Sequence, residues 1–328
     1  MDTIAISKIE EAVIAMIEKL GPDEHDYPVI NSLVNSIADE EEGKAFRDLM
    51  MPVLNGNSLY GYTYYKPLGY AGDYMLIEKM YQTYVSSDPN CRKWDIYYHT
   101  HEATKAVRNR KTYFVKLMEK LCADNRSSLE ILILGSGPAT DVHEFFTRNP
   151  KANISFDCLD IDQRAIDYAS EKNEKYSSKI NFIKMNVLRF MPTKKYDLIW
   201  SAGLFDYLSD RLFTGLVNRF KANLNVTGQM VIGNFSTENP TQRVMEVMGE
   251  WFLNHRSSSH LVRLATEAGI AEDLISVDKE PLGINLFLKI NGNSGQHLQS
   301  ILETTKSLLK ANKERKTRGE AVVQGVKF

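Results

Sequence analysis

Two glycines flank Ser136 directly after an apolar run, in the segment Leu134-Gly135-Ser136-Gly137-Pro138. Glycine lets the main chain turn sharply there, and because it has no Cβ it lets a ligand approach the backbone closely. The residues after the turn are typical of a helix start, so the local order is strand, tight turn and helix. Thr140 stands where the dinucleotide-binding pattern has its third glycine. The turn therefore favours a nucleotide-like ligand without specifying it.

An acidic residue, Asp160, ends the next apolar run and follows Gly137, the second glycine of the turn, along the chain. This separation is close to the roughly 20 residues at which an acidic side chain takes the ribose hydroxyls of a nucleoside cofactor. Ile161 follows directly and is included in the expected site. Asp162 is a competing candidate, but it lies past the end of the strand, so we expect it to cap the following helix.

Two further strands are expected to bring residues to the same edge of a sheet. Asn186 and Val187 follow the apolar run at 180–185, and Ser201 and Ala202 follow the run at 196–200. Ligands of open α/β sheets bind beyond the carboxyl ends of the strands, so these residues should face the ligand of the glycine turn. A polar side chain after the third strand can reach an adenine edge. By analogy with methyltransferases that have a lid, the long helical region before the turn favours S-adenosylmethionine over a nicotinamide nucleotide.

The elements that position these residues change character near residue 129. Before it the apolar residues recur at helical spacing; after it short apolar runs alternate with amphipathic stretches, which predicts a parallel sheet covered on both faces. We predict an α/β, Rossmann-like sheet, mostly parallel with the last strand antiparallel, behind a helical N-terminal lid region. The expected domains are a helical substrate or lid region (1–125), a Rossmann-like cofactor domain (126–292), and a C-terminal helix with a basic tail (293–328).

A Gly- and Tyr-rich segment, residues 60–73, interrupts the helical region. We interpret it as an ordered loop that closes over the ligand as a lid. Tyr65 and Tyr70 are expected to face the ligand, where an aromatic ring attracts a cationic group. Asp73 is expected to lie near the ligand's ammonium group, to cap the helix that follows, or to do both.

Composition narrows the class of protein. The formal net charge of the 328 residues is −2, which gives no general basic field for nucleic acid. Three widely spaced cysteines and no metal-spaced histidines predict no disulfide, no metal and a cytoplasmic location. We expect no signal peptide and no membrane span from the sequence. The expected partner is a small-molecule substrate, and a homodimer is left open.

Longer segments resemble a known family. The sequences LGSGPATDV, CLDID, SAGLFDYLSDRL, GNFSTENPTQRVMEVMGEWFLNHR, KPLGYAGDY and VRNR are similar to those of the bacterial class I methyltransferases of 3-hydroxypalmitic acid methyl ester biosynthesis. The resemblance covers about residues 60–290. It implies S-adenosylmethionine as cofactor, S-adenosylhomocysteine as product, and O-methylation of a fatty-acid-like carboxylate. The block Trp251–Arg256 departs from the family pattern, so we expect a different substrate pocket.

A carboxylate acceptor is already ionised at neutral pH and needs a cation to hold it rather than a base. Arg256, Arg108 and Lys66 are the candidates. We assign catalytic roles to Tyr70, Tyr207 and Arg256, where the two tyrosines line the methyl-transfer pocket. An acceptor with nitrogen or sulfur, or a hydroxyl acceptor that needs a base, is the alternative within this class. A nicotinamide-dependent reductase and a non-catalytic partner subunit are the alternatives from other classes.

Overall fold

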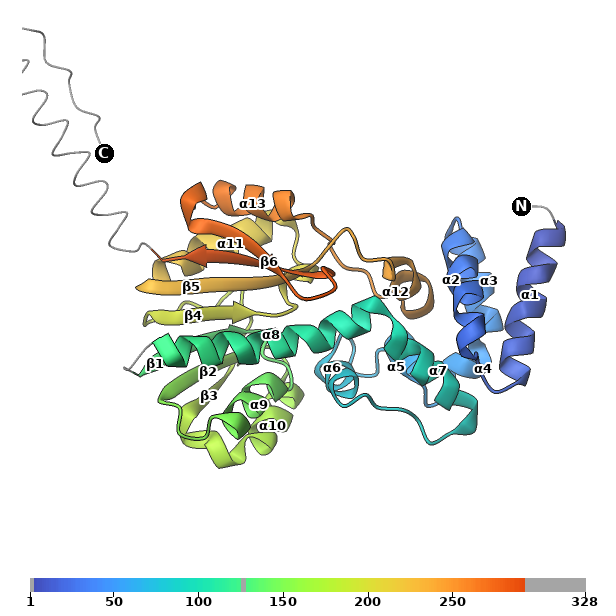
Figure 1. The fold of residues 1–328 in the computed structure, drawn as a ribbon, viewed down its shortest axis with the longest axis horizontal. Helices are drawn as coiled ribbons and strands as arrows, with labels where there is room; N and C mark the ends of the chain where they lie inside the picture. The colour runs from blue at the N-terminus through green and yellow to red at the C-terminus, as the bar shows by residue number, and fades with distance from the viewer. Residues whose placement is uncertain (1–2, 125–127, 293–328) are drawn as a thin grey trace, which may run out of the picture.

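The computed structural model describes residues 3–124 and 128–292, and a seven-stranded sheet forms its centre (Figure 1). The strands follow the order β3-β2-β1-β4-β5-β7-β6, and β7 runs antiparallel to both of its neighbours. Their bounds are β1 Leu129–Leu134, β2 Ile154–Asp160, β3 Ile180–Lys184, β4 Tyr196–Ser201, β5 Leu224–Phe235, β6 Ile275–Lys279 and β7 Asn285–Asn291. The prediction of a mostly parallel sheet with an antiparallel last strand is confirmed.

Alternate residues of the central strands point to opposite faces, and helices cover both faces. On one face Ile131 and Ile133 pack with α8, α9 and α10; on the other Leu132 and Leu134 pack with α11 and α13. These helices are α8 Glu102–Asp124, α9 Thr140–Arg148, α10 Gln163–Lys172, α11 Asp210–Phe220 and α13 Ser258–Glu267. The 3-10 helix η3, Phe205–Tyr207, follows β4. Residues buried on both faces explain why the central strands appear in the sequence as nearly continuous apolar runs.

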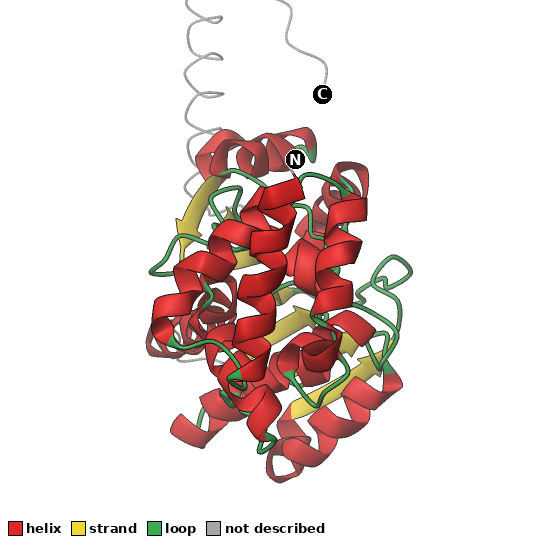
Figure 2. Cartoon of the chain, turned by 90° about the vertical axis from the view of Figure 1, so that its right-hand side faces the viewer, coloured by secondary structure: helices red, strands yellow, loops and turns green. Residues whose placement is uncertain are grey.

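A second core lies among the N-terminal helices, which stand at one end of the sheet (Figures 1 and 2). They are α1 Thr3–Glu18, α2 Tyr27–Ser36, α3 Glu40–Leu49, α4 Met51–Leu54, α5 Leu59–Tyr65, α6 Tyr74–Tyr81 and α7 Pro89–Thr100. Helix α12, Gln242–Gly249, returns from the sheet to pack in this core together with Phe235 and Trp251. The start of α8 packs here too, while its later residues Phe114 and Met118 cover the sheet. Two elements distant in sequence thus join the helical region to the sheet.

The expected loop at residues 60–73 is wrong for its first part, because residues 59–65 form helix α5. The hydroxyl of Ser58 caps this helix by accepting from the backbone N–H of Gly61. Gly61 also lies so close to the main chain of α4 that a Cβ would come within 2.2 Å of the Leu54 carbonyl oxygen. The glycine thus serves close packing of two helices rather than loop mobility.

The remaining sequence predictions concern strand β6, the cysteines, membrane-spanning helices and the C-terminal tail. Strand β6 was missed, because its residues alternate between half-buried and exposed and carry no continuous apolar run. The three cysteines are free, as predicted. Within the described residues, no helix is both long and apolar enough to span a membrane. The helix and basic tail predicted for 293–328 lie outside the described residues.

Candidate active site

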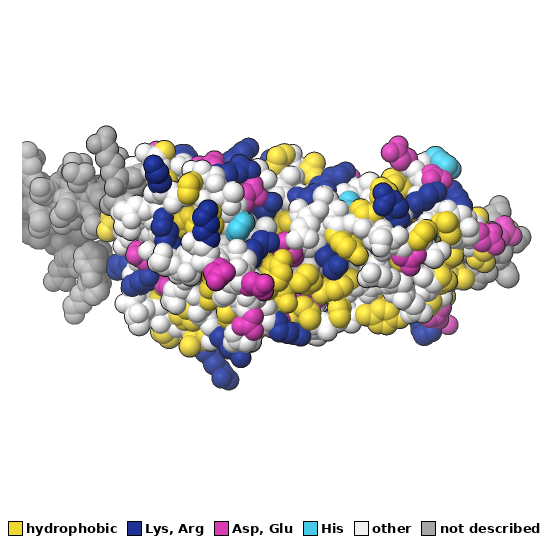
Figure 3. Space-filling model, turned by 90° about the horizontal axis from the view of Figure 1, so that it is seen from below, with side chains coloured by type: hydrophobic (Ala, Val, Ile, Leu, Met, Phe, Trp, Pro, Cys, Tyr) yellow, Lys and Arg dark blue, Asp and Glu magenta, His cyan; other side chains and the backbone are white. Residues whose placement is uncertain are grey.

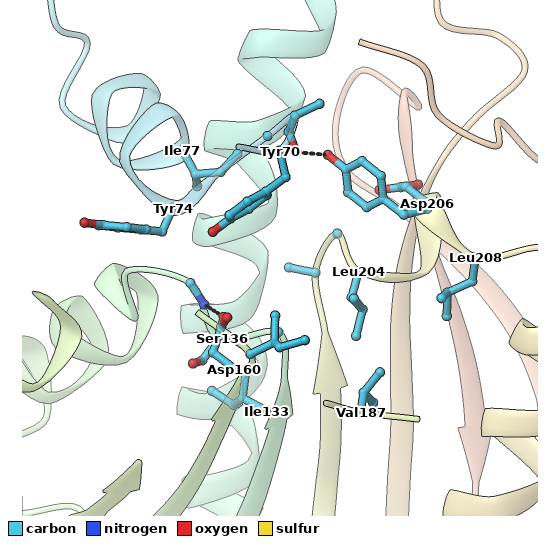
Figure 4. A pocket seen from close by; sticks show the side chains of 18 of the residues that line it. Tyr70, Tyr74, Ile77, Ile133, Ser136, Asp160, Val187, Leu204, Asp206 and Leu208 are labelled. Atoms are coloured by element: carbon cyan, nitrogen blue, oxygen red, sulfur yellow. Dashed lines mark hydrogen bonds between the residues drawn. The ribbon is translucent and has the colours of Figure 1, made fainter. Parts of the chain in front are cut away.

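A cavity of about 570 Å³ opens at the carboxyl ends of β1, β2 and β4 and extends under the N-terminal helices (Figure 4). Most of the predicted site residues line it: Tyr70, Gly135, Ser136, Gly137, Asp160, Ile161, Asn186, Val187, Ala202 and Tyr207. Four of the expected residues, Tyr65, Asp73, Ser201 and Arg256, do not line it. The sheet edge therefore brings the expected cofactor residues together, as the parallel strands require.

The glycine turn has the backbone that its sequence predicts. Gly135 and Gly137 have φ angles of +70° and +54°. Residues with a side chain adopt such positive φ angles only at a cost in conformational energy. A Cβ on Gly135 would meet Leu204 at 3.2 Å, whereas one on Gly137 would make only an ordinary contact with the Cβ of Tyr74 at 3.9 Å. The hydroxyl of Ser136 is buried and has no hydrogen-bond partner among the described residues. The turn thus presents bare main chain and an unpaired hydroxyl to a ligand.

Asp160 connects the end of β2 to this turn. Its Oδ2 accepts the backbone N–H of Gly137 at 2.8 Å, and its Oδ1 accepts that of Asp162 at 3.0 Å. Each carboxylate oxygen can accept a further hydrogen bond, so a ribose diol can be held without breaking these two. Burial raises the pKa of Asp160, although the two N–H groups act against this. Asp162 caps α10 through the N–H of Arg164, as predicted.

A loop at residues 66–73 crosses the mouth of the cavity and is tied to both sides. The Tyr70 hydroxyl donates to Asp162 Oδ2 at 3.0 Å, on the cofactor side. On the other side the Tyr207 hydroxyl donates to the Ala71 carbonyl at 3.0 Å and accepts from Trp251 Nε1 at 2.8 Å. A Cβ on Gly72 would lie 2.3 Å from the Tyr207 hydroxyl, so this contact requires glycine. These bonds hold the loop closed over the cavity.

Asp73 ends this loop as the N-cap of α6, accepting from the N–H groups of Met75 and Leu76 at 2.9 Å each. The capping alternative is confirmed, and Asp73 is not among the residues that line the cavity. Tyr65 is exposed, and its hydroxyl bonds Asn55. Ser201 is buried and donates to the Leu134 carbonyl at 2.9 Å, which ties β4 to β1.

Arg256 lies behind the cavity wall rather than in it. Its guanidinium donates to Asn234 Oδ1 at 2.7 Å, to Asp210 at 3.0 Å and to the carbonyl oxygens of Phe205 and Leu208. With 1% of its surface exposed, it has no donor directed at a substrate. It instead fixes η3 and the end of β5 to each other, a structural role that sequence reasoning could not separate from substrate binding.

The other proposed cations are also engaged elsewhere. Arg108 bonds the ring and carbonyl of His99, and Lys66 bonds the Tyr64 and Gly249 carbonyls. Arg110 is the single basic side chain that lines the cavity within the described part of the chain. It is 7% exposed, and its Nε has no hydrogen-bond partner among the described residues. From the sequence we proposed Arg108 and not Arg110, although the helical periodicity of α8 could have predicted which side of the helix each of the two occupies.

Acidic side chains outnumber basic ones around the cavity. Besides Arg110, the charged residues that line it within the described ranges are Asp141, Asp160, Asp206 and Glu250. Burial raises the pKa of Asp141 to about 6 and that of Asp206 to about 7, while the nearby Arg110 guanidinium lowers both. Such a lining suits a ligand with net positive charge.

Outside the cavity, the side chains of Asp23, His25 and Asp26 lie close enough together to be considered as metal ligands. Lys19 and Lys93, however, pair with the two carboxylates.

The strand order and the site together define the class. An all-parallel dinucleotide-binding sheet has the order 3-2-1-4-5-6. Here the antiparallel β7 lies between β5 and β6, which is the sheet of the class I methyltransferases. Residues 131–228 match the family model of a methyltransferase domain. The described part of the chain therefore has the fold of the class I methyltransferases, and residues 131–228 are similar to a methyltransferase domain.

Three known proteins are similar to this chain over different lengths. Malonyl-[acyl-carrier protein] O-methyltransferases 1 and 2 of Ilyobacter polytropus are 30% identical over 114 residues and 28% identical over 117 residues. Each match covers 35% of this chain, and the chain spans 41% and 42% of the two relatives. A solved structure of a possible exported protein from Bordetella parapertussis matches with a TM-score of 0.62 and 13% identity, over 90% of this chain and 100% of that one. This last likeness extends the shared fold to the N-terminal helices.

S-adenosylmethionine is the cofactor of the class, and the residues present fit it. The bare glycine turn and the unpaired Ser136 hydroxyl suit its main-chain-like methionine part, and Asp160 suits its ribose. Val187 and Ile161 offer apolar surface for the adenine. The Arg110 guanidinium, with its unpaired Nε, suits the cofactor's carboxylate, and the surplus of acids suits its ammonium and sulfonium.

Proposed function

We propose that this protein transfers a methyl group from S-adenosylmethionine to a small molecule. The observation that carries the proposal is that the glycine turn, Asp160 and Arg110 line one cavity beneath a closed loop. When bound, the cofactor supplies an electrophilic methyl group. The residues of this chain bind and align both reactants and exclude water, which accounts for much of the acceleration in such displacements.

Calorimetric titration with S-adenosylmethionine, S-adenosylhomocysteine and NADH tests this proposal. We expect both adenosyl ligands to bind and NADH not to bind. Binding of NADH alone would favour the reductase alternative and sink the methyltransferase proposal.

For the acceptor, our first candidate is a carboxylate oxygen of a fatty-acid-like compound. The two Ilyobacter relatives are named as malonyl-[acyl-carrier protein] O-methyltransferases, which supports oxygen as the accepting atom. Arg110 would then replace Arg256 as the cation that holds the acceptor. Measuring S-adenosylhomocysteine release with a panel of fatty acids tests this candidate, and release with none of them would exclude it.

A second candidate is an acceptor that must lose a proton. The cofactor's own carboxylate competes for Arg110, and within the described ranges the cavity has no other basic side chain to hold a second carboxylate. It does have the buried carboxyl of Asp206, which favours a protic acceptor. Neutral alcohols or phenols in the same release assay distinguish the two candidates.

A further inference from the structure

Asp206 is a buried carboxyl on the wall of the cavity opposite the glycine turn. It lies in η3, just after β4, and 1% of its surface is exposed. Figure 4 shows it on the side of the cavity away from Asp160. Its Oδ1 accepts the backbone N–H of Phe235 at 2.7 Å, and none of the described residues donates a hydrogen bond to its Oδ2. One oxygen is therefore fixed by the fold, while the other remains available to a ligand.

The groups around Asp206 leave it able to exchange a proton near neutral pH. Burial raises its pKa to about 7, and two guanidinium groups lower it: Arg110 from α8 and Arg256 from the segment after α12. The Phe235 N–H from β5 also favours the ionised form. Tyr207, beside it on η3, stays protonated because burial raises its pKa far above neutral. A base works best when its pKa lies near the working pH, and Asp206 meets that condition.

The other ionisable groups of the cavity are less suited to act as a base. The hydroxyls of Tyr70 and Tyr207 already donate to Asp162 and to the Ala71 carbonyl. Asp160 is held in the glycine turn by two N–H groups. The lining contains no histidine among the described residues. Asp141 lies in the first turn of α9, next to the glycine turn, and accepts the Val142 N–H, while Glu250 pairs with Arg47 and Lys66. On the far wall of the cavity, Asp206 is thus the proton acceptor that the geometry offers.

Aromatic side chains surround this part of the cavity. Phe235, Tyr207, Trp251 and Phe252 line it, and Phe252 is 60% exposed. Figure 3 shows hydrophobic side chains gathered near the middle of one face of the molecule. Flat apolar walls next to the buried carboxyl of Asp206 suit an aromatic ring with a hydroxyl group.

We propose that Asp206 takes the proton of a phenolic hydroxyl group, so that the methyl acceptor of this protein is a phenol. This rests on the proposed methyl transfer and selects the second acceptor candidate. The O–H bond of the phenol breaks and its proton passes to Asp206 Oδ2. The oxygen uses the freed electron pair to bond the methyl carbon, and the carbon–sulfur bond of the donor breaks, leaving its pair on a neutral thioether. The product is the methyl ether, and Asp206 then releases its proton to water.

Three probes of one shape test the inference without catalysis: 4-phenylphenol, its methyl ether, and biphenyl-4-carboxylate. Their affinities are measured calorimetrically in the presence of S-adenosylhomocysteine, for the natural protein and for Asp206→Asn. We expect the natural protein to bind the phenol about tenfold or more tightly than the ether, as one hydrogen bond to a charged acceptor provides. In Asp206→Asn this preference should vanish, because the amide keeps its oxygen on the Phe235 N–H and presents an NH₂ group instead. Asp157→Asn, which removes a buried carboxyl of β2 outside the cavity, is the matched control.

Each outcome bears on a different proposal. If the natural protein does not bind S-adenosylhomocysteine, the proposed methyl transfer fails. If it binds this ligand but prefers the carboxylate, binds none of the three probes, or keeps its phenol preference in Asp206→Asn, the role of Asp206 is refuted. A measurement on the natural protein alone guards against misfolding of the variant. Its preference for the phenol should be lost as the pH falls below the pKa of Asp206, because a proton on Oδ2 turns that oxygen from an acceptor of the hydroxyl hydrogen into a donor. A preference independent of pH would also refute the role.

Discussion

Replacement of Asp160 should weaken cofactor binding by a predictable amount. A hydrogen bond to a charged acceptor contributes about 1.5–3 kcal/mol. Loss of that contribution in Asp160→Asn corresponds to a dissociation constant about 10- to 150-fold higher for S-adenosylhomocysteine. The amide oxygen can still accept one of the two N–H groups that Asp160 now holds at 2.8 and 3.0 Å, so the glycine turn should keep its shape.

Asp160→Ala separates the two roles of this side chain. It removes the ribose partner and also leaves the N–H of Gly137 without its acceptor, so its loss of affinity should exceed that of Asp160→Asn. Calorimetric titration gives the constants, and thermal unfolding checks that both variants fold. Asp157→Asn, on the same strand, should bind like the natural protein, because its carboxyl bonds Tyr196 and Asn181 instead. Unchanged affinity in both Asp160 variants would refute the reasoning and move the ribose role to Asp162.

Three further predictions follow from other contacts of the site. Arg256→Ala should lower the free energy of unfolding in urea by about 3 kcal/mol, because it leaves buried acceptors unpaired. The control Arg211→Ala, which replaces an exposed arginine of α11, should change this free energy little, and equal effects of the two variants would contradict the reasoning. Asp206 has a folded-state pKa of about 7, above its ordinary value of 3.8, so its contribution to stability is complete at acidic pH and is lost as the pH rises towards 7 and beyond. Asp206→Asn should therefore gain unfolding temperature relative to the natural protein between pH 5 and pH 8, and a constant difference would argue against the raised pKa. Tyr70→Phe should speed release of S-adenosylhomocysteine by up to about fivefold in stopped-flow measurements, since about 1 kcal/mol of loop contact is lost; an unchanged rate would mean that the loop does not gate release.

Much of the sheet and of the cofactor site could be predicted because their signals are local. A strand buried on both faces must be apolar over successive residues, so β1, β2, β4, β5 and β7 stand out in the sequence. Strand β3 has a shorter apolar run, so six of the seven strands could be predicted. The glycine turn and Asp160 follow from a fixed spacing within one βαβ unit, where few residues separate the ligand-facing positions. Strand β6 carries no such signal, because one of its sides is exposed at the edge of the sheet.

The acceptor side of the cavity could not be predicted in the same way. The sequence alone determined a glycine turn, an acid at the end of the next strand and a helical region before them. Only the tertiary structure decided which of several arginines enters the cavity: Arg110 lines it, while the guanidinium of Arg256 is engaged by β5, η3 and Asp210 at the start of α11. It also placed Asp206 on the cavity wall with one oxygen that no described residue pairs. The physical reason is that burial and pairing of a charged side chain depend on elements far apart in the chain, and no local spacing records them.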